Sequence, residues 1–309
     1  MQLNKPGLYT GIAPADYFAD PAPQPSLTQS LAKIILDRSP LHAWYAHPRL
    51  NPDFVDDDAT KYDVGNIAHA LLIGRGKTIE VLEGFDDWRK KEAQELRKEA
   101  AAAGRLAVLP KHFAKADRMV SSARTQLAQR GLEDLFTEGH GEVVLLWQED
   151  HIWLRQMIDW LTPDRMTFCD FKTTEQSASP VKLDAKMWND GWHIQAAMAE
   201  RGLDAMDPTS HGRRDYLFVV QEAAPPYLLT VARICEAPLT IARKQLQWAV
   251  DRWTECQANN VYPGYPLETV EPAMPGWAEQ QWLTREIDEA DSKRRDRPAP
   301  PLDRIFSGG

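Results

Sequence analysis

The chain has 309 residues, of which 43% are hydrophobic and 26% charged, as in a soluble globular protein that buries a substantial core. Its formal net charge of −9 argues against a protein that coats nucleic acid, although a local basic patch could still grip a short stretch. There is no membrane-length apolar run, no signal-peptide core and no paired spacing among Cys169, Cys235 and Cys256, so we expect a cytoplasmic protein without a disulfide framework.

The first half of the chain is predicted to be helical. Residues 1–25 are rich in proline and aperiodic, which indicates an extended N-terminal arm. Ser26-Leu27-Thr28-Gln29 is typical of a capping box and predicts a helix from Ser26 to about Asp37. Further helices are expected over residues 41–45, 64–73, 87–103 and 110–130. These elements make up a helical part over residues 26–135.

The second half reads as an α/β core over residues 136–260. Three runs rich in Val, Ile, Leu, Trp and Phe predict consecutive antiparallel strands over residues 142–147, 151–161 and 166–174. A helix over residues 181–201, strands over 216–221 and 227–234, and a helix over 239–258 follow. We therefore expect a single domain over residues 26–285 with a mixed sheet, and a mobile C-terminal tail over 286–309.

The most informative residues are Asp159, Asp170 and Lys172. Asp170 and Lys172 are two positions apart in a strand-like run, so their side chains share one face while Phe171 points into the opposite layer. A turn centred between Asp164 and Arg165 would pair Asp159 directly with Asp170, with Cβ atoms roughly 4.5–5.5 Å apart. Two such carboxylates repel each other unless a proton or a cation lies between them, and a divalent cation with oxygen ligands suits the position.

Three further residues have both a structural and a functional interpretation. His69 could be a hydrogen-bonded core histidine or a neutral imidazole ligand of the same metal. Glu142 could be a solvated strand end or another oxygen ligand, directly or through water. Gln195 could be a polar position of an amphipathic helix or a hydrogen-bond partner of a substrate phosphate. Trp188 and Trp192, four residues apart, are interpreted as core packing rather than a base-stacking platform.

Taken in order, these residues resemble those of the PD-(D/E)xK nuclease superfamily, and more closely the exodeoxyribonuclease VIII group of phages and prophages. The N-terminal likeness lies in Pro6-Gly7-Leu8-Tyr9, Asp16-Tyr17, Ser30-Leu31-Ala32-Lys33 and Ser39-Pro40-Leu41-His42. The core likeness lies in His69, Glu142, Asp159, Asp170-x-Lys172 and Gln195. The resemblance covers roughly residues 6–260. It departs from the family at Ala199, where a tyrosine is expected, and at Met157-Ile158, where the lead-in to Asp159 is less basic.

The resemblance implies a restriction-endonuclease-like core, a mixed central sheet flanked by helices, with an N-terminal helical elaboration. It also implies an exonuclease that uses one or two Mg²⁺ or Mn²⁺ ions to digest one strand of duplex DNA from a free 5′ end. His69, Glu142, Asp159, Asp170 and the backbone carbonyl of Phe171 would bind metal, Lys172 would orient the attacking water, and Gln195 would position the phosphate.

Further expectations from the resemblance concern partners: a ring-like homo-oligomer, a single-strand annealing protein and a role in DNA recombination, without a membrane. Two alternatives share the same fold. One is a catalytically idle DNA-binding or recombination scaffold, against which the presence of Lys172 argues, and the other is a structure-specific endonuclease.

Overall fold

The computed structural model describes residues 1–55, 64–75 and 78–295, and the chain divides into two compact units, Met1–Gly264 and Tyr265–Gly309. The described part of the second unit contains helix α10 (Gly276–Arg295), which has no buried residue. The sequence predicted the boundary at residue 286, and the structure instead divides the chain after Gly264 and continues a helix across residue 286. Within the described residues, no helix is both long enough and apolar enough to cross a membrane.

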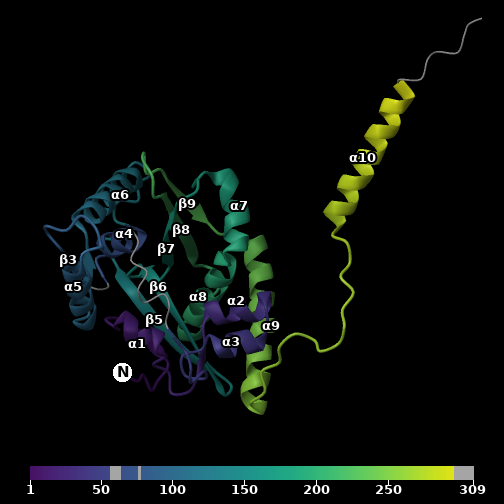
Figure 1. Cartoon of the computed structure of the whole chain (residues 1–309). Helices are drawn as coiled ribbons and strands as arrows, with labels where there is room; N and C mark the ends of the chain where they lie inside the picture. The colour runs from purple at the N-terminus through teal and green to yellow at the C-terminus, as the bar shows by residue number, and fades with distance from the viewer. Residues whose placement is uncertain (56–63, 76–77, 296–309) are drawn as a thin grey trace, which may run out of the picture. The chain divides into compact units, whose positions relative to one another are not determined.

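A mixed sheet forms the centre of the first unit (Figure 1). Its order is β1-β5-β6-β7-β8-β9, with β2 added in parallel to β6. The strands are β1 (Gly7–Tyr9), β2 (Ser26–Leu27), β5 (His140–Glu149), β6 (Ile152–Leu161), β7 (Thr167–Thr174), β8 (Asp215–Glu222) and β9 (Leu229–Arg233). β5, β6 and β7 form the expected antiparallel meander, and β8 runs parallel to β7. The predicted α/β class with a mixed central sheet is therefore confirmed.

The turn between β6 and β7 sets the register on which the site depends. The Thr162 hydroxyl donates to Asp164 Oδ1 at 2.6 Å, and the same oxygen accepts from the Met166 backbone N–H at 3.0 Å. Such local side-chain bonds stabilise a turn because they replace backbone partners. The strands pair Leu161 with Phe168 and Trp160 with Cys169, which is the register predicted from the sequence.

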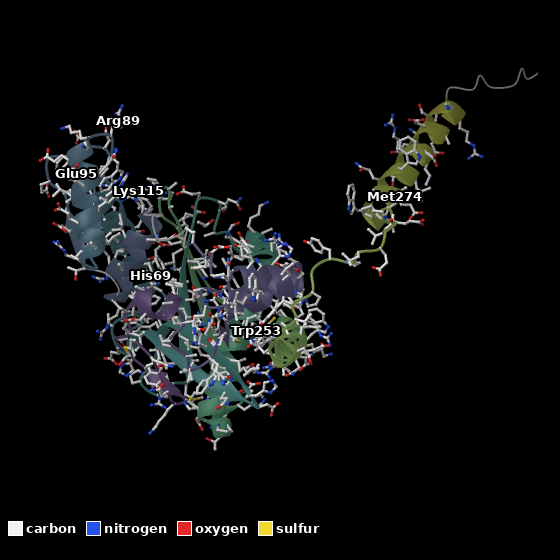
Figure 2. All side chains as sticks on the ribbon, turned by 60° about the horizontal axis from the view of Figure 1, so that its bottom comes forward. His69, Arg89, Glu95, Lys115, Trp253 and Met274 are labelled. Carbon is white, nitrogen blue, oxygen red and sulfur yellow. The ribbon has the colours of Figure 1, made fainter. Side chains whose placement is uncertain are left out.

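Helices cover both faces of the sheet. They are α1 (Pro14–Phe18), α2 (Gln29–Asp37), α3 (Pro40–Tyr45), α4 (Val64–Ile73), α5 (Lys91–Ala102), α6 (Pro110–Ala128), α7 (Pro180–Asn189), α8 (Trp192–Met206) and α9 (Glu236–Asn259), with a 3₁₀ turn, η2 (Pro208–Ser210). α2, α3, α8 and α9 pack on one face around Trp147, Phe218 and Trp253, and α4 and α6 pack on the other. His69 and Trp253 thus lie on opposite sides of the sheet (Figure 2).

The N-terminal residues differ from the extended arm that the sequence predicted. They form β1 and α1, and Leu3, Ile12 and Tyr17 are buried. Asp20 anchors the segment, because its buried carboxylate accepts from the Ser26 hydroxyl at 2.7 Å and lies 2.8 Å from Arg155 Nη1. Breaking a buried ion pair of this kind leaves an uncompensated buried charge, so the segment is part of the core and not an appendage.

Three local predictions were wrong. Ser26 lies in β2 and not in a capping box, and the N-cap of α2 is Thr28, whose hydroxyl accepts from the Leu31 N–H. The helix predicted over residues 181–201 is two helices, because Gly191 adopts φ +75° and ends α7 before α8 begins. A separate pair of parallel strands, β3 (Ile79–Val81) and β4 (Leu106–Val108), lies inside the part expected to be helical.

Close packing of α8 against β5 gives a first testable prediction. A Cβ atom at Gly202 would lie 2.8 Å from a Trp147 ring carbon and 2.9 Å from a Leu145 methyl group, closer than packed atoms approach. We therefore expect Gly202→Ala to lower the free energy of unfolding by about 1–3 kcal/mol, despite the better helix propensity of alanine. Urea denaturation measures the change, and Ala205→Ser, an exposed position of the same helix, is the control. An unchanged or higher stability would contradict the close contact.

Candidate active site

Three carboxylates occupy one level of three adjacent strands. In the β5–β6 ladder, the pairs Gly141–Trp160 and Val143–Ile158 flank Glu142 and Asp159, so these two residues lie opposite each other. In the β6–β7 ladder, the pair Trp160–Cys169 is followed in register by Asp159 and Asp170. The topology thus aligns Glu142, Asp159 and Asp170 in a row across the sheet. Glu142 adopts φ +51°, an uncommon conformation for a residue other than glycine.

Strands β6 and β7 separate at this row. Their ladder consists of two residue pairs, whereas β7 remains paired with β8 over eight positions, from Thr167 to Thr174. Beyond Cys169 the backbone N–H of Phe171 donates to Asp159 Oδ2 at 3.0 Å instead of to a β6 carbonyl. The carboxylate of Asp159 therefore takes the place of a ladder bond and is held between the two strands.

His69 approaches the row from α4. Its Nε2 lies 3.1 Å from Asp159 Oδ2, and its ring lies 6.4 Å from that of Phe171, which points into the predicted opposite layer. Burial alone would lower the pKa of His69, but the charge and the hydrogen bond of Asp159 outweigh it and raise the pKa to about 9. His69 is thus a charged partner of Asp159 at neutral pH, and it must lose a proton before it can bind a metal.

Asp170 and Lys172 form the second pair. Lys172 Nζ lies 2.7 Å from Asp170 Oδ1, and the Gln195 amide of α8 donates to Asp170 Oδ2. The Asp170 side chain is 3% exposed and that of Lys172 29% exposed, so the lysine reaches solvent while the carboxylate does not. The predicted shared face of Asp170 and Lys172 is therefore occupied by their ion pair.

The two aspartates are electrostatically unequal. Burial and then the charge of Asp159 raise the pKa of Asp170 above its usual range, in spite of Lys172. Burial also acts on Asp159, but the charge and hydrogen bond of His69, with Lys172, outweigh it and lower its pKa. Burial, and to a smaller extent Asp159, raises the pKa of Glu142. Opposite pKa shifts in neighbouring carboxyl groups are typical of active sites, where acid and base groups need different pKa values.

The donor set fits a divalent cation. Three carboxylates are oxygen ligands of the kind that Mg²⁺ and Mn²⁺ accept, and the imidazole of His69 lies beside Asp159. Burial and the neighbouring carboxylate charge raise the pKa values of Asp170 and Glu142, and a bound cation would oppose that rise. Asp170 Oδ1 is buried and makes no hydrogen bond of good geometry, although Lys172 lies close to it. Among the described residues no three His, Cys, Asp or Glu side chains already converge as a metal site. Asp159 and Asp170 are each turned toward a cationic side chain, so metal binding requires them to reorient.

The family comparison gives the position of this chain among known proteins. The model of the PDDEXK-like domain of unknown function (DUF3799) matches residues 36–271, most of the chain. The chain belongs to this family. Family membership agrees with the sheet topology and with the row of acidic residues beside Lys172. No protein of curated function matches the sequence.

One solved structure supports the same fold. The crystal structure of a Eubacterium rectale protein with the name "Putative exonuclease" superposes with a TM-score of 0.51 at 10% identity, over 81% of this chain and 91% of that chain. At this identity the likeness concerns the fold alone. A second structure, SSO0001, covers 74% of this chain and 91% of its own at 11% identity, but its TM-score of 0.27 carries no argument.

Direct contacts join His69 to Asp159, and Lys172 and Gln195 to Asp170. The register places Glu142 in the same row as the two aspartates. The Gln195 amide donates to Asp170, a contact that the role expected of Gln195 in positioning the phosphate does not include. Ala199, in place of the expected tyrosine, is fully buried in the core. Asp190, which sequence reasoning did not select, contributes to the raised pKa of Lys172. The signal that could have indicated it was the Asp190-Gly191 pair as a helix end.

Proposed function

We propose that this protein is a metal-dependent nuclease that degrades one strand of linear duplex DNA from a free end. The observation that carries the proposal is the Asp170–Lys172 pair, in which the buried carboxylate is held by Gln195 and aligned with Asp159 and Glu142 while the lysine reaches solvent. Family membership and the fold of the Eubacterium rectale protein support a nuclease. The 5′ to 3′ direction and a role in recombination rest on the resemblance of the sequence motifs.

Each residue has a role that follows from its surroundings. Asp159, Asp170 and Glu142, with His69 once it is deprotonated and the Phe171 carbonyl, would hold one or two Mg²⁺ or Mn²⁺ ions. When bound, such an ion makes water more acidic and withdraws charge from the scissile phosphate. Lys172 donates hydrogen bonds only, so it can orient a water molecule and stabilise negative charge that develops on phosphate. The Gln195 amide keeps Asp170 oriented.

The proposed activity is tested by the topology of the DNA. We expect the protein to degrade end-labelled linear duplex in the presence of Mg²⁺ and to leave covalently closed circles intact. Addition of EDTA should stop degradation. Labels on the 5′ or the 3′ end of one strand then report the polarity, since digestion from the 5′ end releases a 5′ label at once and leaves 3′ tails. If the protein cuts closed circles, it is an endonuclease and not an exonuclease. If it cuts neither substrate, the proposal is overturned.

A ring-like homo-oligomer that encloses duplex DNA is part of the proposal, because it would keep the enzyme on one strand. We expect light scattering after size exclusion to give a mass several times that of the 35.0 kDa chain at micromolar concentration. A single species at the mass of one chain would contradict the ring without affecting the nuclease proposal, which the degradation assay tests separately.

A further inference from the structure

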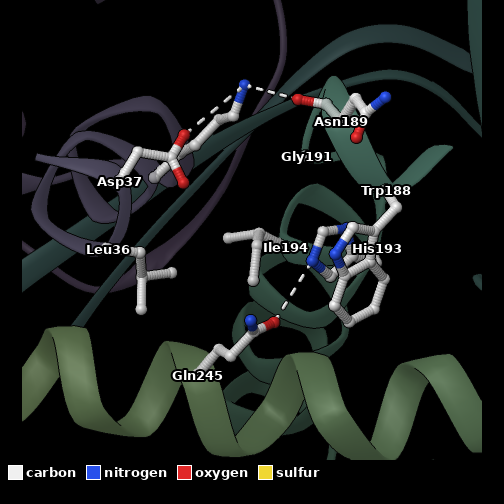
Figure 3. Close-up of a pocket in the computed structure, with 9 residues that line it drawn as sticks. Leu36, Asp37, Trp188, Asn189, Gly191, His193, Ile194 and Gln245 are labelled. Atoms are coloured by element: carbon white, nitrogen blue, oxygen red, sulfur yellow. Dashed lines mark hydrogen bonds and ion pairs between the residues drawn. The ribbon is translucent and has the colours of Figure 1, made fainter. Parts of the chain in front are cut away.

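A cavity of about 290 Å³ lies where α2, α7, α8 and α9 meet (Figure 3). We call it the Trp188 pocket, and it is lined by Lys33, Asp37, Trp188, Asn189, His193 and Gln245. Its lining shares the first turn of α8 with Gln195 of the candidate active site. His193 is two residues before Gln195 on the first turn of α8.

The pocket presents a rigid aromatic surface. The rings of Trp188 and His193 are stacked with centroids 4.1 Å apart and planes 7° apart (Figure 3). His193 is buried, and its ring nitrogens lie 3.3 Å from the Met187 carbonyl and 3.2 Å from Gln245 Oε1. Trp188 in contrast is 45% exposed. An indole that is held by a stacked ring and remains partly exposed offers surface on which a flat ring can stack at low entropic cost.

The break between α7 and α8 creates this surface. The sequence predicted that Trp188 and Trp192 would form one core stripe, but the turn at Gly191 separates them. Trp192 packs into the core against Phe218, and Trp188 remains at the surface. Gly191 also makes room for Lys33, because a Cβ at this position would lie 2.7 Å from the Lys33 Cδ atom. Lys33 Nζ in turn donates to the Asn189 carbonyl at 3.1 Å and joins α2 to the end of α7.

The polar groups of the pocket suit a base better than a phosphate. Asp37 is 60% exposed and lies 3.8 Å from Lys33 Nζ, so the lysine charge is already partly matched and the carboxylate would repel a phosphate. Asp37 and Asn189 carry side-chain oxygen acceptors on the pocket lining, which can accept from the ring N–H and amino groups of a nucleobase. Stacking with hydrogen bonding to base edges is how proteins hold unpaired nucleotides.

We propose that the Trp188 pocket binds an unpaired base of the DNA strand on which the candidate active site acts. This inference rests on the proposed nuclease function and specifies how that site would hold its substrate. A base in the pocket is separated from its complementary strand, which would help to present one strand of the duplex to Lys172. Trp188 supplies the stacking surface, and the acceptors around it hold the base edge.

The test compares two labelled single-stranded oligonucleotides of equal length, one with bases and one abasic, by fluorescence anisotropy in EDTA so that no cutting occurs. We expect the wild-type protein to prefer the oligonucleotide with bases. Trp188→Leu should weaken its affinity about 5- to 150-fold, the range that loss of base stacking gives, and leave binding of the abasic oligonucleotide unchanged. Trp248→Leu, at an exposed tryptophan of α9, is the matched control and should change neither affinity.

The outcomes separate the two proposals. The pocket assignment would be overturned if wild type and Trp188→Leu bound the oligonucleotide with bases equally well. It would also be overturned if the wild type bound the abasic oligonucleotide as tightly as the one with bases. A deoxynucleoside monophosphate that competes at the same concentration as the oligonucleotide would assign the pocket to released product and overturn its assignment to the strand. Degradation of linear duplex with Mg²⁺ reports on the nuclease separately, so base preference without degradation would retain the pocket and reject the proposed function.

Discussion

Lys172→Ala should abolish measurable degradation of linear DNA while the protein continues to bind Mn²⁺. The Lys172 ammonium group lies 2.7 Å from Asp170 and the side chain is partly exposed, so the lysine can contact both the carboxylate row and a substrate. It cannot bind metal while protonated, and the carboxylates raise its pKa further above the physiological range in spite of burial. Losing one donor that stabilises developing charge typically costs about 10²–10³ in rate. A degradation assay together with calorimetry in Mn²⁺ measures both properties.

The control for this variant is Lys182→Ala on α7, where the lysine is exposed and outside the row. It should degrade DNA at the wild-type rate. If Lys172→Ala keeps more than about a tenth of the wild-type rate, its loss is smaller than that of a transition-state donor, and the role assigned to the lysine is wrong. If it instead loses Mn²⁺ binding, the ion pair with Asp170 organises the metal ligands, and the rate alone says nothing about catalysis.

Much of the site could be predicted because it depends on local rules. The side chains of a strand alternate, so Asp170 and Lys172 had to share a face, and the Thr162–Asp164 turn determined which β6 residue lies opposite Asp170. The fold class followed from the same runs of apolar residues. The helix break at Gly191 was missed because residues on both sides of it keep a helical pattern, although glycine is common where a helix ends with a positive φ, here +75°.

Contacts between distant segments could not be predicted from patterns. The sequence indicated two like charges at Asp159 and Asp170, without indicating which of them would be neutralised. In the structure His69, contributed by a helix far away in the chain, pairs with Asp159 and lowers its pKa, whereas burial and Asp159 raise the pKa of Asp170 in spite of Lys172. The N-terminal segment was mispredicted for the same reason, since the partner that buries Asp20 is Arg155 on β6.

This inequality leads to the second prediction: without metal, Asp170→Asn should make the protein more stable. A group whose pKa is raised on folding stabilises the fold at pH values below its unfolded pKa, and that contribution is lost as the pH rises through the raised value. At about pH 8 the wild type therefore bears the cost of an ionised, buried Asp170, which asparagine avoids at nearly the same shape. Lys172 loses its partner in the variant, but it is 29% exposed and can be hydrated instead.

Thermal and urea unfolding in EDTA should show a gain of about 1–2 kcal/mol for Asp170→Asn at about pH 8 and almost none at about pH 4, where the wild-type carboxyl group is itself protonated. Asp184→Asn, at an exposed position of α7, is the control and should stay within about ±0.5 kcal/mol at both pH values.

Mn²⁺ should reverse the order of the two proteins, because the wild type gains stability from the bound ion while the variant has lost an anionic ligand. Mn²⁺-induced shifts of equal size in both would show that Asp170 does not bind the metal. A loss of stability in EDTA would show that its pairing with Lys172 outweighs its burial, and either result would require the charge assignment of the row to be redrawn.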